Sequence, residues 1–554
     1  MYRILFFFVI CSLQLYAQQT KTPELIQIAE REINRTIEGL KDKPNPPYFI
    51  SYYITETQSY RLAGTNGVID TKNHDSSRML DIQVKVGDYK FDNSHLIRGN
   101  PLNFNSSMGR IELPFVDDEK AITNIMWFAT DKAYKNAIER YEKALTNSKV
   151  KVQEEDTSAD FSIEEPVVAI ENGELYRLNL DNYQDLIKRL SSKFSKHKWI
   201  LNSSVSFFGN SIKKIIVTSE GTKIQTYENY FYIFVNASTK ADDGMSLPLY
   251  RSFYSYDPYN MPNEKDIEAE IDKLIDLLDK LRIAPYAEVY TGPAMLSGRA
   301  AGVFFHEIFG HRVEGHREKD PNSSQTFKKS IGEKILPEFM NIIFDPTLKK
   351  LNNKPIAGFY VYDDEGVKAQ KVEIVKNGVF SDFLMSRIPI EGFSKSNGHG
   401  RKSSGYTAVT RQSNLIVQSS LTKSLDELKQ ELRQIAKEQG KDYGLFFDDV
   451  SGGFTFTSRS IPNAFNVTPM VVYKVYVDGR PDELVRGVDL IGTPLTTFAN
   501  IVGVGDDLGI FNGICGAESG GVPVSACSPS LLVSRIEVQK KLKSQAKPPI
   551  LPAP

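Results

Sequence analysis

The spacing of two histidines constrains this chain more than any other feature of its sequence. Residues 306–316 read HEIFGHRVEGH, which begins like the helical HExxH motif of zinc sites but has one more residue before the second histidine. On a straight α-helix five residues turn through about 500°, so the side chains of His306 and His311 would point about 140° apart. Both can reach one ion only if a π-bulge deforms the helix or if the helix ends between them. Gly310, directly before His311, gives the backbone that freedom.

The segment before this motif predicts a buried helix. Residues 296–305, LSGRAAGVFF, are apolar and rich in alanine, and Ser297 can cap the amino terminus of a helix. Glu307 then lies in an apolar segment, where a carboxylate without a partner is costly. Water held by a metal ion would be such a partner. An HExxxH sequence also arises by chance in a chain of this length, so the motif alone does not establish a metal site.

A catalytic zinc site needs a third protein ligand and an open position. One candidate is Cys515, which lies in the glycine-rich stretch 511–533, expected to be a turn between apolar runs. The other is His316, five residues after His311, which we expect in a solvated loop. The alternative for Cys515 is a disulfide with Cys527 across a short loop. Zinc coordination would instead hold Cys515 as a thiolate.

Five ordered stretches of the chain resemble the successive motifs of the TldD/PmbA family. In that family, members with HExxxH are zinc metallopeptidases and members without it are partner subunits. The resemblance implies that Glu307 is the general base and that His316 is not a ligand. It implies three ligands for Zn²⁺, namely His306, His311 and Cys515. The family's Gly-Gln-Gly after the cysteine is Ser519-Gly520-Gly521 here. The stretches are residues 290–315, 361–387, 397–414, 484–494 and 513–524.

The resemblance also implies a substrate and a partner. The expected substrate is a short or unfolded peptide, held in an enclosed groove by β-strand addition. The expected assembly is a homodimer, or a heterodimer with a second TldD/PmbA-type subunit. Two other functions stay open. One is a cysteine peptidase with Cys515 as nucleophile, which would leave Glu307 unexplained. The other is a non-catalytic peptide-binding partner subunit, against which the intact HExxxH and cysteine argue.

The amino-terminal segment predicts export. Residues 1–17 contain Arg3, an apolar run and a small residue at Ala17, which is the pattern of a signal peptide. We therefore expect a periplasmic or secreted protein. The apolar run is too short for a stable membrane span, with a retained anchor as the alternative. The formal net charge of −2 and the lack of Lys/Arg runs argue against a nucleic-acid partner.

The length of 554 residues exceeds what one hydrophobic core usually supports, so we expect two domains. The apolar stripe of residues 264–282 predicts a helix that Pro285 ends, at the domain boundary. The predicted fold class is α+β. A mixed α/β domain (18–285) precedes a mainly antiparallel β domain (286–540) that carries the metal-site helix. Residues 541–554 are rich in proline and are expected to be a disordered tail.

Other polar clusters have structural alternatives. The acidic stretch 363–365 could hold a second metal, but a turn after the strand GFYVY explains it equally well. Arg401 and Arg411 could hold the backbone or carboxylate of a substrate, although salt bridges inside the domain are the favoured interpretation. His399 lies between glycines and could approach the site, but we do not predict that it is catalytic.

Overall fold

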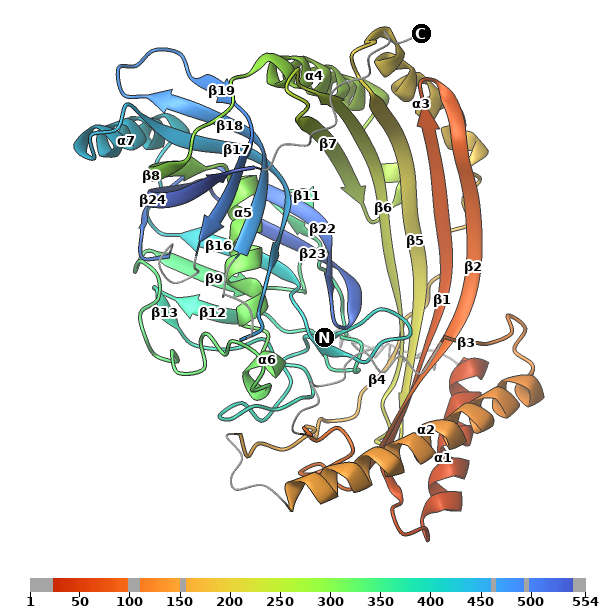
Figure 1. Cartoon of the computed structure of the whole chain (residues 1–554). Helices are drawn as coiled ribbons and strands as arrows, with labels where there is room; N and C mark the ends of the chain where they lie inside the picture. Colours follow the sequence, from red (N-terminus) through yellow and green to blue (C-terminus); the bar gives the residue numbers. More distant parts are fainter. Residues whose placement is uncertain (1–22, 98–109, 150–155, 460–464, 493–497, 542–554) are drawn as a thin grey trace, which may run out of the picture.

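The computed structural model describes residues 23–97, 110–149, 156–459, 465–492 and 498–541 (Figure 1). It contains a large curved sheet formed by the amino-terminal half and two further large sheets in the carboxy-terminal half. The predicted signal peptide and the predicted disordered tail lie outside the described residues, apart from Lys541. None of the described helices combines the length and the apolar character that a membrane crossing requires.

The amino-terminal half is built on long antiparallel strands in the order β3-β2-β1-β5-β6-β4, with β7 also paired to β6. Alternation along these strands gives the sheet two different faces. One face packs against helices α1 and α2 at one end and α3 and α4 at the other. The other face is turned toward the carboxy-terminal half. The strands are β1 (Pro47–Thr65), β2 (Val68–Val86), β3 (Ile111–Glu112), β4 (Val168–Ile170), β5 (Asn202–Thr218), β6 (Lys223–Lys240) and β7 (Ser246–Ser255).

The helices of this half follow the expected sequence signals. Asp118 caps α2 and Asn263 caps α4, each through a side-chain oxygen that accepts a backbone N–H three residues ahead. The apolar stripe of α4 is buried, as its spacing predicts. The helices are α1 (Glu24–Leu40), α2 (Glu119–Ser148), α3 (Asp181–Ser192) and α4 (Glu264–Ile283), with 3-10 turns η1 (Lys193–Lys196) and η2 (Pro258–Asn260).

The carboxy-terminal half contains one sheet that closes on itself. Its strand order is β17-β8-β24-β20-β18-β19. Because β17 also pairs with β18, the strands from β17 to β18 form a closed ring, and β19 lies outside it. Most pairings are antiparallel, while β17 and β8 are parallel. The strands are β8 (Tyr290–Leu296), β17 (Tyr443–Thr455), β18 (Phe465–Tyr476), β19 (Glu483–Val485), β20 (Val488–Gly492), β21 (Ile501–Val504) and β24 (Leu531–Lys540).

The second sheet of this half ends in the hairpin that carries Cys515. The strand order is β13-β12-β9-β16-β23-β22, so β22 is an edge strand. Its strands are β9 (Met340–Phe344), β12 (Val372–Lys376), β13 (Val379–Phe380), β16 (Asn414–Ser419), β22 (Gly509–Ala517) and β23 (Gly520–Ser528). Two short hairpins complete the half, β10 (Lys350–Leu351) with β11 (Lys354–Pro355) and β14 (Gly400–Arg401) with β15 (Val409–Thr410).

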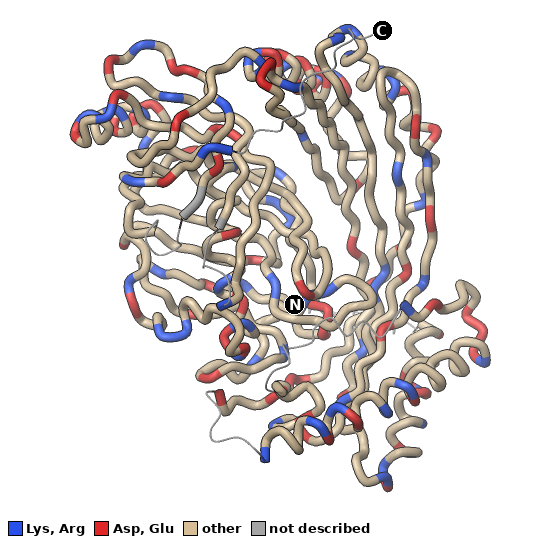
Figure 2. The backbone as a smooth tube through the Cα atoms, in the orientation of Figure 1, with Lys and Arg blue, Asp and Glu red and all other residues tan. Residues whose placement is uncertain are grey.

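Helix α5 (Gly298–Ile308) lies between the two sheets and packs against β17, β22 and β23. Ten of its eleven residues are buried, which is why its sequence is apolar on every side. The turn η3 (Gly310–Arg312) and the short helix α6 (His316–Lys319) follow it, and α7 (Leu425–Glu438) packs on β8 and β17. Lys and Arg are interspersed with Asp and Glu over both halves (Figure 2).

The predicted α+β class is confirmed, with a mostly β carboxy-terminal half. The largest hydrophobic cluster lies entirely in residues 287–538, and two others lie almost wholly before residue 285. The division into domains at residue 285 itself stays a prediction.

Candidate metal centre

The backbone breaks between the two histidines. Ser297 caps α5 as predicted, since its Oγ accepts a hydrogen bond from the N–H of Ala300. The helix ends at Ile308, and Phe309 has φ −119° and ψ −54° before the 3-10 turn η3 begins. A helix end followed by a tighter turn therefore accommodates the five-residue spacing. The alternative that we considered, a π-bulge within a continuous helix, is absent from this segment.

Gly310 is required by close packing at this break. A Cβ atom at this position would lie 1.9 Å from Oε1 of Gln412. The same Gln412 side chain donates a hydrogen bond from Nε2 to the backbone oxygen of His306 at 3.3 Å. Any side chain at position 310 would displace the amide that fixes the end of the helix.

Cys515 lies on a strand and not in the turn where we expected it. It belongs to β22, where it pairs with Val522 of β23. The turn of this hairpin follows at Glu518 and Ser519. Arg411 holds the hairpin, donating from Nη2 to the backbone oxygen of Cys515 at 2.6 Å and from Nη1 to the Ser519 hydroxyl at 2.9 Å. A strand position is stiffer than a turn, so the thiol has a defined direction.

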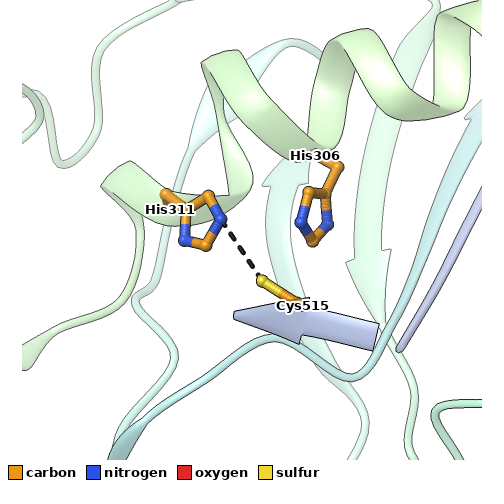
Figure 3. A group of neighbouring side chains, drawn as sticks. All are labelled: His306, His311 and Cys515. Atoms are coloured by element: carbon orange, nitrogen blue, oxygen red, sulfur yellow. Dashed lines mark hydrogen bonds between the residues drawn. The ribbon is translucent and has the colours of Figure 1, made fainter. Parts of the chain in front are cut away.

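The three predicted ligands meet at one point (Figure 3). One donor atom each from His306, His311 and Cys515 lies within 4.8 Å of the other two. The Nε2 atom of His311 is 3.4 Å from the Cys515 Sγ. Ligand atoms in tetrahedral zinc sites lie about 3.4–3.6 Å apart, given Zn–N of about 2.0 Å and Zn–S of about 2.3 Å. The donor types and the His311–Cys515 separation therefore fit a zinc ion.

The site favours a thiolate. Burial alone would raise the pKa of the Cys515 thiol, but His311 and His306 outweigh it and hold that pKa well below its usual value. Burial would lower the pKa of His311, and Cys515 together with Glu314 raises it well above the usual value. Metal ligation requires a deprotonated cysteine, so the electrostatics prepare the thiol for a cation.

The buried carboxylate of Glu314 contacts the ring nitrogen of His311 that does not face Cys515. The Nδ1 atom of His311 lies 3.2 Å from Oε2 of Glu314, which also accepts a hydrogen bond from Arg317 Nε at 2.8 Å. Burial would raise the pKa of Glu314, but His311 and Arg317 lower it to about 2. Glu314 is therefore a carboxylate that holds the Nδ1 side of the His311 ring and leaves Nε2 to face the thiol.

Glu307 faces the same space as the ligands. It lines a cavity of about 600 Å³ together with His306, His311 and Cys515. Only 6% of its surface is exposed, and burial raises the pKa of its carboxyl group, with the two histidines as partly opposing charges. A carboxylate with a raised pKa is a stronger base toward water.

The cavity lies between the two halves of the molecule. One side is formed by α5, β17 and β22, and the other by β5, β6 and β7 of the amino-terminal sheet. Its lining is largely aromatic and apolar, with the polar groups of the candidate centre at one place. This composition is typical of ligand sites.

One prediction about a neighbouring residue is wrong, and one alternative is absent from the structure. His316 is 1% exposed and its Nε2 lies 2.6 Å from Oε1 of Glu518, so it is not in a solvated loop. It is not one of the three grouped donors. Cys515 and Cys527 are both free thiols, so the structure does not have the alternative disulfide. Cys527 instead packs in an apolar cluster, and burial raises its pKa to about 12.

The acidic stretch 363–365 is occupied by protein groups. Asp363 accepts hydrogen bonds from the backbone N–H groups of Val367 and Gly400, at 2.8 and 2.9 Å. Asp364 binds the ammonium of Lys214 at 2.8 Å across the two halves. The sequence allows two interpretations of this stretch, a structural turn and a second metal site. These contacts support the turn.

The two arginines and His399 have structural contacts. Arg401 donates to the backbone oxygens of Gln412 and Pro523, at 2.7 and 2.8 Å, and Arg411 holds the β22–β23 hairpin. We expected salt bridges inside the domain. The contacts are internal, but the hydrogen bonds of Arg401 go to carbonyls, and of the two arginines only Arg411 has an ion pair within the described residues, with Glu314 at 3.7 Å. His399 is fully buried and lies 3.1 Å from the Ser413 hydroxyl, so it does not line the cavity.

Sequence reasoning missed the residues that support the ligands. Glu314 follows His311 by three positions, the spacing of neighbours on a helical surface, and this could have indicated a partner. Arg411 and Gln412 approach from a loop about 100 residues away, and nothing in their local sequence indicates that contact.

Comparisons with known proteins place the candidate centre in a stretch shared with named metalloproteases. Residues 290–540 match the model of the PmbA/TldA metallopeptidase C-terminal domain. A Methanothermobacter thermautotrophicus protein named a metalloprotease is 28% identical over 60% of this chain and 69% of its own. A Saccharolobus solfataricus protein named a zinc metalloprotease TldD homolog is 26% identical over 44% of this chain and 51% of its own. The solved structure of TldE from Thermococcus kodakarensis covers 92% of this chain and 99% of its own, with 14% identity and a TM-score of 0.59.

The matched domain and the names of these relatives indicate the metallopeptidase class, and the three grouped donors lie within the matched residues. Over residues 290–540 the chain resembles the TldD/PmbA family. The TldE structure, at 14% identity, supports the overall fold alone.

Proposed function

We propose that this protein is a zinc-dependent peptidase that hydrolyses peptide bonds in short or unfolded chains. The observation that carries the proposal is the grouping of His306, His311 and Cys515 within 4.8 Å, in a cavity that Glu307 also lines. When bound, a zinc ion would supply Lewis acidity toward the scissile carbonyl and toward the attacking water. A thiolate ligand donates more charge than imidazole, so we expect modest turnover.

The chain's own residues perform the proton transfer. A Glu307 carboxylate oxygen takes a proton from the attacking water and passes it to the leaving amine nitrogen. Glu307 follows His306 directly, on the last turn of α5, and the backbone break at Phe309 brings His311 to the same side. Burial raises the pKa of the Glu307 carboxyl group, which suits a group that both accepts and returns a proton.

The cavity supports a peptide without its own folded structure. Its walls come from both halves of the molecule and border a partly open space of about 600 Å³, which is room for a few residues and not for a folded domain. The strand β22, which carries Cys515, is the edge of its sheet. An edge strand has free backbone groups, so an extended substrate could pair with it.

A cysteine peptidase is the second candidate, because one observation favours it. Cys515 Sγ lies 3.4 Å from Nε2 of His311, whose Nδ1 lies 3.2 Å from Oε2 of Glu314. A nucleophile, a base and an orienting carboxylate would be arranged in this order. This arrangement assigns no role to His306 or Glu307, both of which line the cavity.

Zinc analysis and chelation separate the two candidates. The metallopeptidase should contain about one zinc per chain, lose activity with a chelator and regain it with added zinc. Cys515→Ser should lose most of the zinc. A chelator-treated protein that keeps full peptidase activity, with zinc shown to be absent, would favour the cysteine peptidase.

Export and assembly complete the proposal. The signal-peptide pattern of residues 1–17 supports a periplasmic or secreted location, which fractionation of cells would test. A homodimer, or a heterodimer with a family member that lacks HExxxH, is the assembly that the family resemblance implies, and we keep it as a proposal. A protein that acts as such a non-catalytic subunit would keep its biological effect after Glu307→Gln.

A further inference from the structure

Aromatic side chains of the amino-terminal sheet face the candidate metal centre across the cavity. Phe208 of β5, Tyr232 and Phe234 of β6, and Tyr250 of β7 line the same space as Glu307. The strand register explains why they share one face. Phe208 pairs with Tyr232 across the strands, and residues two apart on β6 point the same way.

The four rings form two stacked pairs. Phe208 and Tyr232 stack with ring centroids 5.0 Å apart and an angle of 11° between the planes. Phe234 and Tyr250 stack at 5.0 Å and 20°. Tyr232 and Phe234 are two residues apart on one strand, so the pairs begin about 7 Å from each other along β6.

Three of the four rings of this aromatic wall are accessible, whereas Tyr232 is buried, and the wall carries no charge. Phe208, Phe234 and Tyr250 are half-buried, in contrast to the neighbours that pack in the core on the other face. The fifth residue that the sheet contributes to the described lining is Ser252. The wall therefore offers apolar ring surface toward the centre.

One polar atom on the wall lacks a partner. The hydroxyl of Tyr232 is buried and makes no hydrogen bond with any residue that the structure describes. The Tyr250 hydroxyl differs, since it accepts from Arg299 Nη2 at 2.7 Å and donates to the Ser451 oxygen at 3.2 Å. A buried hydroxyl without a partner is costly, and this one packs beside Tyr254 and Ala357 away from the open part of the cavity.

The opposite side of the cavity is apolar near the thiol. Ile514, next to Cys515 on β22, is 51% exposed, and Phe454 of β17 is 50% exposed. Both line the cavity together with Phe511. A chain between these residues and the aromatic wall would have apolar surface on both sides and the candidate centre beside it.

We propose that the aromatic wall is a pair of subsites for two large apolar side chains, two residues apart, on one extended substrate. The inference rests on the proposed peptidase function and names its substrate class. Side chains at positions i and i+2 of an extended peptide lie on one face about 7 Å apart, which is the spacing along β6 of Tyr232 and Phe234, the rings that β6 contributes to the two pairs. The preferred substrates are segments in which apolar and polar residues alternate, such as strands of an unfolded protein.

Binding to a protein that does not cleave tests this inference. The Glu307→Gln protein is titrated with a fluorescent nonapeptide that has two phenylalanines separated by one polar residue. Its isomer has the same composition with the phenylalanines adjacent. We expect the alternating peptide to bind about tenfold more tightly, because only it places both rings on the wall.

Variants of the wall show where the difference arises. Phe234→Ala in the same protein should weaken binding of the alternating peptide about tenfold and leave the isomer nearly unchanged. Phe234→Leu keeps the apolar volume for folding and should have a smaller effect in the same direction. The control is Tyr259→Ala, an aromatic residue 69% exposed outside the cavity, which should change neither affinity.

The outcomes separate this inference from the function on which it rests. Equal affinities for the two isomers, no measurable binding of either, or an unchanged preference in both Phe234 variants would overturn it. Cleavage of both isomers at equal rates by the wild-type protein would reject the subsites and keep the peptidase. A clear binding preference with no cleavage by the zinc-loaded protein would keep the subsites and reject the peptidase.

Discussion

The Nε2 atom of His311 lies 3.4 Å from Sγ of Cys515, although 204 positions separate the two residues in the chain. Arg411 connects the supports of both. It donates a hydrogen bond to the backbone oxygen of Cys515, and its Nε lies 3.7 Å from Oε1 of Glu314, the carboxylate that holds His311. One buried guanidinium therefore fixes a ligand from α5–η3 and a ligand from β22 relative to each other.

Removing this support should weaken metal binding. Glu314→Gln loses the negative charge that orients His311, and we expect about 10–100-fold lower zinc affinity. Competition with a chromophoric chelator measures the affinity, and thermal unfolding of the metal-free protein checks the fold. The matched control is Glu318→Gln, a buried carboxylate on α6 outside the ligand group. Equal losses in both variants would show that Glu314 has only a general structural role.

Gly310→Ala should destabilise the protein. The new Cβ would lie 1.9 Å from Oε1 of Gln412, so that side chain must move and release the backbone oxygen of His306. We expect a loss of about 1–3 kcal/mol in the free energy of unfolding. The control is Gly39→Ala near the end of α1, where nothing lies within 4 Å of the added atom. There the helix propensity of alanine predicts a gain of up to about 1 kcal/mol. Similar changes in the two melting temperatures would contradict the packing argument.

Local patterns in the sequence predicted the elements that depend on local physics. The stripe of α4, the cap at Ser297 and the need for a break near Gly310 follow from periodicity and helix geometry, and the structure has all three. The meeting of His306 and His311 with Cys515 was expected only from the family resemblance. Their spacing along the chain does not encode it, because it depends on how β22 packs beside α5.

The remaining features depend on contacts between distant segments. His316 is buried because it contacts Glu518 in the turn of the β22–β23 hairpin. The hydrogen bond from Arg411 to the backbone of Cys515 comes from a loop beside the same hairpin. The aromatic wall alternates along β5, β6 and β7 with core residues. The alternation indicates strands, but it does not say which face meets the metal centre.

His399 should make the protein less stable in acid. Burial lowers the pKa of its imidazole from 6.5 to about 3. Between these values the unfolded chain binds a proton that the folded chain does not, so stability falls as pH decreases below 6.5. The loss is about 1.4 kcal/mol per pH unit, or about 2 kcal/mol between pH 6.5 and 5. Chemical unfolding of wild type and His399→Asn at both pH values should show a smaller decrease in the variant. Equal decreases would mean that His399 is protonated in the folded state.

Folded proteins should be poor substrates. The cavity of about 600 Å³ lies between the two halves, and a strand can add to an edge only if it is free of its own partners. A stable single domain and its reduced, alkylated and unfolded form can be compared at equal concentration. We expect cleavage of the unfolded form only, and equal initial rates for the two forms would contradict an enclosed site.

The measurement that tests the central claim most directly is the turnover of Glu307→Gln, with zinc content determined in the same sample. The amide has nearly the shape of the carboxylate and Glu307 is not among the three grouped donors, so zinc content and folding should match wild type. The amide cannot accept a proton from the attacking water, and loss of a general base costs about 10²–10⁴-fold in rate. We therefore predict normal zinc and a kcat at least about a hundredfold lower. A zinc-loaded variant that keeps more than about a tenth of wild-type kcat would show that another group is the base and that the assignment of Glu307 is wrong.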